Sequence, residues 1–211
     1  MEKNYSILVL IFAFFITFGL LESANTQTVI NFDGLGNHTP IPQDRNEAVN
    51  IDLTYNTVAG IGSTIETYNY LSAWTTGYGD LSSAAFATYS NKTGQIIFTP
   101  DPGHGVTINS LDAAIYEQSS INPQRIVIYD FNQLTMPLWD SGWMNFPLYT
   151  HTTLYPNLTH HGAIRLQFGT NWNFGINNIS YAVSPEPSTV LLLGSSLVGL
   201  GLISYFRRKR A

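Results

Sequence analysis

The sequence predicts an all-β protein whose body is a jelly-roll-like β-sandwich set between two hydrophobic ends. Residues 49–55 alternate apolar side chains (Val, Ile, Leu, Tyr) with polar ones (Asn, Asp, Thr), which is the pattern of a half-buried strand. Glycine and proline turn signals separate this run from others like it. No window of the body has a convincing helical period. Together these observations favour many short strands over helices.

The remaining strands are predicted from the same combination of β-branched or aromatic residues and flanking turns. They are expected at 28–32, 65–70, 84–89, 95–99, 106–111, 113–116, 125–130, 163–168 and 176–183. The turn signals between them lie at 33–34, 92–94, 100–103, 122–123 and 141–142. Strands this short, at this spacing, are typical of a β-sandwich or jelly roll.

The N-terminus has the order of a secretory signal peptide. Lys3 is followed by the apolar run 7–21 and then by the small residues Ser23 and Ala24. The run is shorter than the roughly 20 residues of a membrane-spanning helix. We therefore expect residues 1–24 to be a signal peptide, cleaved near Ala24, so that the body at 25–183 is exported.

The C-terminal segment, 184–211, combines three ordered features. The motif Pro185, Glu186, Pro187 precedes the uncharged stretch 189–206, which predicts a single transmembrane helix. The basic tail follows at once as Arg207, Arg208, Lys209 and Arg210. Because basic residues beside a hydrophobic segment stay cytoplasmic, the tail is expected inside and the body outside.

This order of motif, short hydrophobic helix and arginine-rich end resembles the PEP-CTERM sorting signal of Gram-negative bacteria. The resemblance implies that an exosortase reads residues 185–187 and that the protein is held only transiently in the inner membrane. It also implies a final place at the cell surface or outside the cell, with exopolysaccharide and biofilm. The two prolines favour an extended segment, which is accessible to a membrane protease.

Composition excludes several classes of function. The chain has no cysteine, so disulfides and thiol chemistry are excluded. Only 11% of its residues are charged, against about 25% in average globular proteins. The body holds four basic and eleven acidic residues, a net charge of −7, which disfavours nucleic acid as a partner.

Segments of the body are similar to jelly-roll domains that often precede PEP-CTERM signals. The segments are 30–33, 106–111 and 174–179, the last of which carries Asn177 where that group usually has aspartate. Such domains resemble carbohydrate-binding modules. The resemblance therefore implies a sandwich that binds sugars.

Clustered aromatic residues are the candidate ligand-binding groups. Their flat rings can stack on sugar faces, with polar neighbours for the hydroxyls. Trp74 precedes a Thr-Thr-Gly turn and Trp143 follows a Ser-Gly turn, so these two are predicted at loop tips and are the first candidates for glycan stacking. The alternative is that the rings fill the core. The aromatic groups in question are Tyr68, Tyr70, Trp74 and Tyr78; then Trp139, Trp143, Phe146, Tyr149 and Tyr155; and Trp172.

The residues for catalysis and for metal binding are few. The body has three glutamates and no strand with the repeated carboxylates of jelly-roll glycosidases, and no G-x-S-x-G motif is present. We therefore expect no catalytic residues and no cofactor. One oxygen-ligand calcium site, joining the first and last strands through Asp33 and Asn177, remains a weaker hypothesis beside ordinary turn hydrogen bonding.

Taken together, the sequence predicts a non-enzymatic, exosortase-sorted surface or matrix protein whose sandwich binds carbohydrate. Two alternatives stay open at this point. One is a polysaccharide-processing enzyme, a glycosidase or lyase, which would bring two carboxylates together in a cleft. The other is a purely structural adhesion protein, whose uncharged strand edges could pair with other chains.

Overall fold

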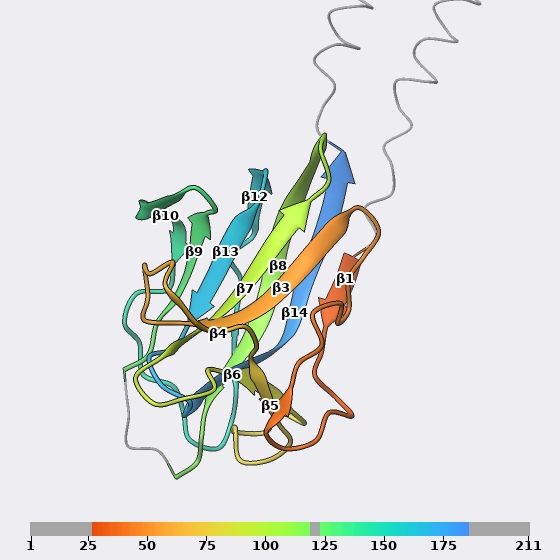
Figure 1. Cartoon of the computed structure of the whole chain (residues 1–211). Coiled ribbons are helices and arrows are strands. Elements are labelled where there is room, and N and C mark those ends of the chain that lie inside the picture. The colour runs from red at the N-terminus through yellow and green to blue at the C-terminus, as the bar shows by residue number, and fades with distance from the viewer. Residues whose placement is uncertain (1–26, 119–122, 186–211) are drawn as a thin grey trace, which may run out of the picture.

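The computed structural model describes residues 27–118 and 123–185, which form two antiparallel β-sheets packed face to face (Figure 1). The prediction of an all-β sandwich is confirmed for this part of the chain. The signal peptide at 1–24, Glu186, Pro187 and the C-terminal segment beyond them lie outside the described residues. Within the described residues, no helix has the length and apolar character needed to cross a membrane.

The first sheet has eight strands and is built around the long last strand. Its main order is β11-β8-β14-β6-β5-β2, with β12 also on β8 and β1 also on β14. The strands are β1 (Gln27–Ile30), β2 (Thr39–Pro40), β5 (Ser72–Trp74), β6 (Ala84–Phe86), β8 (His104–Ile115), β11 (Thr152–Leu154), β12 (Leu158–His161) and β14 (Phe174–Pro185).

The second sheet has six strands in the order β10-β9-β13-β7-β3-β4, all antiparallel to their neighbours. They are β3 (Ile51–Val58), β4 (Glu66–Tyr68), β7 (Thr93–Pro100), β9 (Ile126–Asp130), β10 (Gln133–Asp140) and β13 (Ile164–Phe168). The central strands β9, β13 and β7 are rich in isoleucine and phenylalanine, which suits strands that are buried on the inner face.

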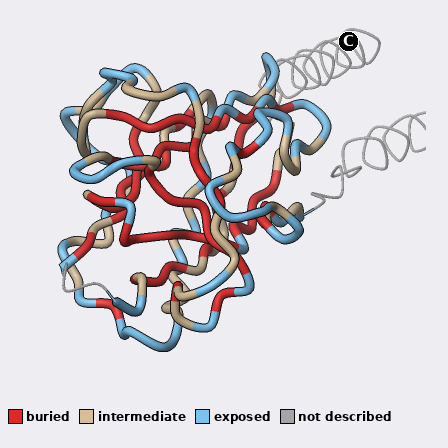
Figure 2. The backbone as a smooth tube through the Cα atoms, turned by 60° about the horizontal axis from the view of Figure 1, so that its bottom comes forward, coloured by how far each residue is buried: buried red, intermediate tan, exposed pale blue. Residues whose placement is uncertain are grey.

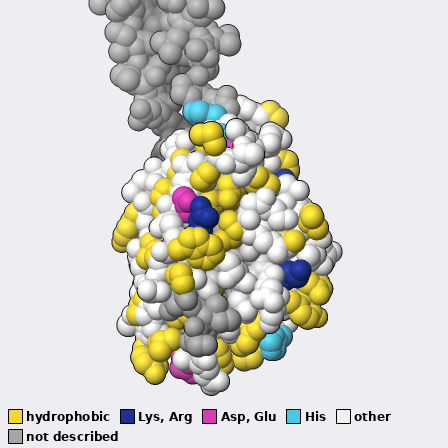
Figure 3. All heavy atoms as spheres, turned by 90° about the vertical axis from the view of Figure 1, so that its left-hand side faces the viewer, with side chains coloured by type: hydrophobic (Ala, Val, Ile, Leu, Met, Phe, Trp, Pro, Cys, Tyr) yellow, Lys and Arg dark blue, Asp and Glu magenta, His cyan; other side chains and the backbone are white. Residues whose placement is uncertain are grey.

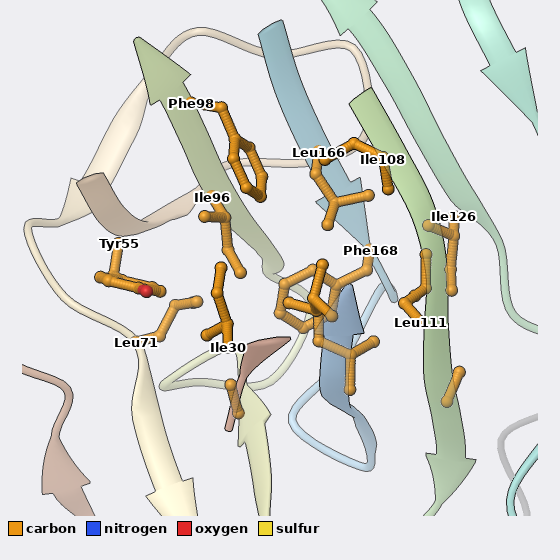
Figure 4. Packing of buried hydrophobic residues seen from close by; sticks show 14 of the residues in the cluster. Ile30, Tyr55, Leu71, Ile96, Phe98, Ile108, Leu111, Ile126, Leu166 and Phe168 are labelled. Atoms are coloured by element: carbon orange, nitrogen blue, oxygen red, sulfur yellow. The ribbon is translucent and has the colours of Figure 1, made fainter. Parts of the chain in front are cut away.

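The inner faces of the two sheets share one hydrophobic core. Ile96 and Phe98 of β7 meet Ile108 and Leu111 of β8 across the sandwich, and Phe168 fills the space between them (Figure 4). All five side chains are fully buried. Viewed from the end, the buried backbone runs through the middle of the fold and the exposed loops surround it (Figure 2).

The two ends of the described chain leave the same end of the sandwich. Gln27 of β1 pairs with Ala182 of β14, and Pro185 pairs with His104 at the start of β8 (Figure 1). At its opposite end, β14 begins with Phe174. At the usual rise of a strand, its 12 residues span about 35–40 Å. The sandwich therefore has an end beside Pro185 and, well separated from it, an end formed by β5, β6 and the start of β14.

Several strand predictions need correction. Val49 was expected in a half-buried strand, but β3 begins at Ile51 and Val49 is 81% exposed. The strands predicted at 106–111 and 113–116 form one long β8. Edge strand β10 was missed, because Pro137 interrupts its pattern and most of its side chains are exposed on both faces. An edge strand needs no buried face, so it carries little alternation for a sequence to show.

Candidate functional site

An aromatic pocket of about 320 Å³ lies at the end of the sandwich away from Pro185. Trp74 and Phe86 enter it from β5 and β6, Tyr116 from the residue after β8, and Trp172 from the turn before β14. The complete lining is His38, Trp74, Tyr78, Phe86, Thr88, Tyr89, Ser90, Tyr116 and Trp172. No aspartate, glutamate, lysine or arginine of the described chain is among these residues, so the pocket is aromatic and nearly uncharged.

The rings of the lining pack directly against one another. The centroid of Trp74 lies 4.4 Å from that of His38 in an edge-to-face arrangement, and Tyr78 stacks on Phe86 at 5.9 Å. Tyr116 contacts Tyr78 at 5.4 Å. Aromatic pairs in such arrangements contribute about 0.5–1.5 kcal/mol beyond the burial of their area. The walls therefore hold one another in place before any ligand arrives.

Two glycines allow this close approach of the rings. Gly77 has φ +82°, and a Cβ built on it would lie 2.6 Å from the ring of Tyr116. A Cβ on Gly175 would lie 2.8 Å from the Cβ of Ala84 and 3.0 Å from the ring of Tyr78. Larger residues at either position would push the aromatic wall apart, so the shape of the pocket depends on both glycines.

A short polar contact holds the His38 loop over β5. The side-chain oxygen of Asn37 accepts hydrogen bonds from the backbone nitrogen of Thr75 at 2.8 Å and from its hydroxyl at 2.7 Å. His38 itself has φ +57° and precedes β2, which pairs with β5. This contact places the His38 ring on Trp74 and makes one wall of the pocket from two adjacent strands.

The polar groups of the pocket are phenols, aliphatic hydroxyls, two indoles and the imidazole of His38. Burial and the neighbouring Tyr116 raise the pKa of Tyr78 well above 10, and its hydroxyl donates to the backbone carbonyl of Trp172. The indole nitrogen of Trp74 is shielded from solvent and has no hydrogen-bond partner among the described residues. A mostly apolar cavity with a few placed polar groups is the usual form of a small-molecule site.

The sequence named some of these residues and missed others. Trp74 was expected at a loop tip, but it is the last residue of β5 and is only partly exposed. The structure keeps it together with Tyr78, which the sequence had placed in the same group, and adds Trp172, which the sequence had set apart. Phe86 and Tyr116 were not named, because their contribution depends on sheet pairing between segments far apart in the chain.

Trp143, the second predicted stacking residue, lies outside the pocket in different surroundings from Trp74. Its side chain is 56% exposed, as expected, and the Arg125 guanidinium lies 5.9 Å from its ring centroid. Arg125 Nε also donates to Asp140 at 2.8 Å, and this contact lowers the pKa of Asp140. Trp143 therefore sits beside an ion pair on an open surface and is absent from the pocket lining.

The residues of the predicted calcium site do lie close together. Asp33 Oδ1 accepts hydrogen bonds from the hydroxyls of Ser82 and Ser83, each at 2.7 Å, and these bonds lower the pKa of Asp33. Asn177 donates to Ser83 at 3.3 Å and accepts from the backbone nitrogen of Phe32 at 3.2 Å. Ser83 thus joins the two residues. The described residues contain no group of three or more histidines or carboxylates placed to hold a metal, and calcium stays a prediction.

Two carboxylates of the described chain, those of Asp80 and Asp112, flank His151. Its Nδ1 lies 2.7 Å from Asp80 and its Nε2 lies 3.7 Å from Asp112. Asp112 also accepts hydrogen bonds from Thr153 and Asn178, so its oxygens are engaged in tying β8, β11 and β14 together. This arrangement fixes the 141–155 segment to the sheet. None of these three ionisable residues lines the aromatic pocket.

Only the first residue of the predicted sorting motif falls in the described chain. Pro185 is the last residue of β14, in register with His104. Glu186, Pro187 and the basic tail lie outside the described residues. Pro185 thus places the start of the predicted sorting segment beside the end of the sandwich that is remote from the pocket.

Comparison with known proteins finds no matching family model and no matching curated protein. Solved structures of low similarity are found. A domain assembly from Clostridium perfringens ZmpB, with an M60 catalytic domain and two CBM51 domains, is 9% identical with a TM-score of 0.34. That match covers 76% of this chain but only 15% of the larger protein.

Two smaller proteins match along most of their length. A family 29 carbohydrate-binding module from Piromyces equi is 14% identical, with a TM-score of 0.35, over 79% of this chain and 95% of its own. CBM51 from Clostridium perfringens GH95, solved with methyl-galactose, is 11% identical, with a TM-score of 0.31, over 74% and 99%. At such low similarity, the function of this chain has to be argued from its own residues.

Proposed function

We propose that this chain is an exported, non-catalytic protein whose β-sandwich binds a neutral carbohydrate in the aromatic pocket. The observation that carries the proposal is the lining itself. Trp74, Tyr89 and Trp172 offer ring surface for the apolar faces of a sugar, while Ser90 offers a hydroxyl. The absence of formal charge in the described lining favours an uncharged ligand over an acidic one.

The net charge of the body supports the same choice. With a net charge of −7, the body repels acidic polymers, and it has few basic residues with which to hold them. Charged side chains are also sparse on the face that carries β9 and β10, where hydrophobic patches lie among uncharged polar surface (Figure 3). Ring stacking is then the main source of affinity.

The affinity expected from such a site is low. Stacking of a nucleobase on an aromatic side chain contributes about 1–3 kcal/mol, and sugar stacking is taken as similar in scale. A dissociation constant of 1 mM needs about 4 kcal/mol. One pocket thus holds a sugar weakly, and firm retention on an insoluble polysaccharide requires several contacts, which can lie on neighbouring chains of the same material. We propose exposed Trp143 as an accessory contact of this kind.

Binding is tested on the full chain purified in mild detergent. A panel of neutral and acidic glycans is presented to the wild type and to Trp172→Ala, with Tyr149→Ala as the matched control because Tyr149 is exposed and outside the pocket. We expect neutral glycans to bind the wild type and the control, and Trp172→Ala to lose most of that binding. Equal binding by all three proteins would exclude the pocket.

We further propose that residues 184–211 are a PEP-CTERM sorting signal read by an exosortase. The supporting observations are the motif at 185–187, the uncharged stretch at 189–206 and the basic tail at 207–210. Export across the inner membrane and processing at the motif would then leave the sandwich at the cell surface or in the extracellular matrix. Because the pocket lies at the far end from Pro185, it would face away from the membrane before processing.

Sorting is tested by replacing Pro185, Glu186 and Pro187 with alanine in a host that has an exosortase. We expect the altered protein to accumulate at full length in the membrane fraction, while the wild type is processed and released from that fraction. A second variant, in which Pro156 is replaced with alanine, controls for loss of a proline elsewhere. Processing of the triple variant at the wild-type rate would refute the sorting proposal.

A further inference from the structure

A stacked pair of tyrosines stands at the rim of the aromatic pocket. The ring centroids of Tyr68 and Tyr89 are 4.5 Å apart and their planes differ by 19°. Tyr89 lines the pocket and is 51% exposed, whereas Tyr68, at the end of β4 in the other sheet, is not part of the lining. The pair therefore extends the aromatic surface from the pocket outwards across the boundary between the sheets.

A group of hydroxyls fixes the segments that carry this pair. Thr57 Oγ1, on β3, donates to the backbone carbonyl of Tyr70 at 2.9 Å and lies 3.4 Å from Thr88 Oγ1. The hydroxyl of Thr88 also donates to the carbonyl of Tyr70 at 3.4 Å, and Ser72 Oγ lies 3.3 Å from it. Since Thr88 precedes Tyr89 and Tyr70 lies just after β4, these bonds hold both tyrosine segments in fixed positions.

The phenol of Tyr68 is held in its neutral form. Partial burial, together with the neighbouring phenol and hydrogen bond of Tyr89, raises the pKa of Tyr68 above its usual value near 10. Tyr70 lies beside it, with its ring centroid 6.0 Å from that of Tyr68. The surface therefore combines ring faces with neutral hydroxyls, which is the same chemistry as the pocket.

The size of the pocket limits how much of a ligand it can hold. Its volume of about 320 Å³ is near the lower end of the roughly 300–1,000 Å³ range of small-molecule sites. Tyr78 and Phe86, both 2% exposed, close its inner side. A chain of sugars can therefore place only its end inside, and the units that follow must leave past the rim.

We propose that the Tyr68–Tyr89 pair is a second sugar position, so that the site takes the end of a neutral glycan chain of two or more units. The terminal sugar occupies the pocket and the next one stacks on the tyrosine pair. This proposal rests on the proposed function and specifies its ligand class. It predicts that affinity depends on chain length over the first few sugars and then stops increasing.

The test measures dissociation constants by titration calorimetry on the full chain in detergent. The probes are the one-, two- and four-unit members of glucose, mannose and galactose series. For the series that binds, we expect the tetrasaccharide to bind about tenfold more tightly than the monosaccharide, because tenfold corresponds to one modest stacking contact. Tyr68→Ala should reduce this ratio to near one, while Tyr149→Ala should keep it.

The outcomes separate the two proposals. If a monosaccharide binds as tightly as the tetrasaccharide, or if Tyr68→Ala retains the tenfold ratio, the second position is refuted and the pocket stands. If no series binds, both are refuted.

Chain-end recognition is tested by measuring stoichiometry with chains of increasing length. Binding of one protein per chain at constant affinity supports it, whereas binding of several proteins per chain overturns it. Thermal melting of each variant confirms that it is folded.

Discussion

The two tryptophans predicted to stack on sugars lie in contrasting surroundings. Trp74 is partly buried in a pocket where rings from β5, from β6, from the residue after β8 and from the turn before β14 pack together. Trp143 stands on an open surface beside one arginine and one aspartate. The comparison shows that the exposure of a ring and the shape of the surface around it are different properties. An exposed ring alone offers one face, whereas a partly buried ring among others forms a site of defined shape.

Removing a side chain from the inner wall of the pocket should cause the largest loss of stability. Tyr78→Ala deletes a side chain that is 2% exposed and that contacts Phe86, Tyr116 and the carbonyl of Trp172. We expect a loss of about 3–5 kcal/mol in the free energy of unfolding. For a domain of this size the melting temperature should fall by about 10 °C.

Differential scanning calorimetry checks the change in melting. Tyr149→Ala is the control, because Tyr149 is 73% exposed and should change the unfolding free energy by less than about 0.5 kcal/mol. A Tyr78→Ala protein that melts with the wild type would show that the wall does not stabilise the fold.

Trp172→Ala separates binding from stability. Trp172 is 37% exposed, so its removal should cost less stability than that of Tyr78, yet it takes one ring face from the pocket. We expect affinity for the bound oligosaccharide to fall about tenfold or more, given roughly 1–3 kcal/mol per stacked ring. Calorimetric titration measures this loss. Unchanged affinity in a protein of unchanged melting temperature would remove Trp172 from the site.

Trp143→Ala tests the exposed ring outside the pocket. Because Trp143 is outside the pocket, the affinity for a short oligosaccharide should match the wild type, and the melting temperature should shift by less than about 2 °C. Retention on an insoluble neutral polysaccharide should decrease, since an accessory contact acts only through avidity. Retention equal to the wild type in a pull-down would show that Trp143 has no part in binding.

The stability contributed by the ion pair beside Trp143 should depend on pH in the acid range. Arg125 lowers the pKa of Asp140 below 3.8, so the ion pair stabilises the fold above that pH and the contribution is lost as pH falls through the lowered value. Because the pair is near the surface, this contribution is below about 1 kcal/mol. Acid denaturation of Asp140→Asn between pH 5 and 2 should show a correspondingly shallower dependence on pH; an identical curve would contradict the assignment.

Local sequence patterns were enough to predict the class of fold and to name candidate aromatic and calcium-binding residues. Alternation in 49–55 and the glycine and proline turns predicted strands, because backbone pattern and turn chemistry are local properties. The two residues of the calcium hypothesis were chosen from their places along the chain, because Asp33 follows the first strand and Asn177 lies in the last. The structure places both next to Ser83. The predicted sorting motif also depends only on order along the chain, and it stays a prediction.

The set of aromatic residues that line the pocket depends on the tertiary structure. Phe86 and Tyr116 are separated by 30 residues, and they come together because β6 and β8 both pair with β14. The stacking of Tyr68 on Tyr89 likewise joins β4 of one sheet to the segment after β6 of the other. A ring's neighbours in a β-sandwich are set by strand pairing and by packing between sheets, and both are long-range interactions that local sequence does not encode.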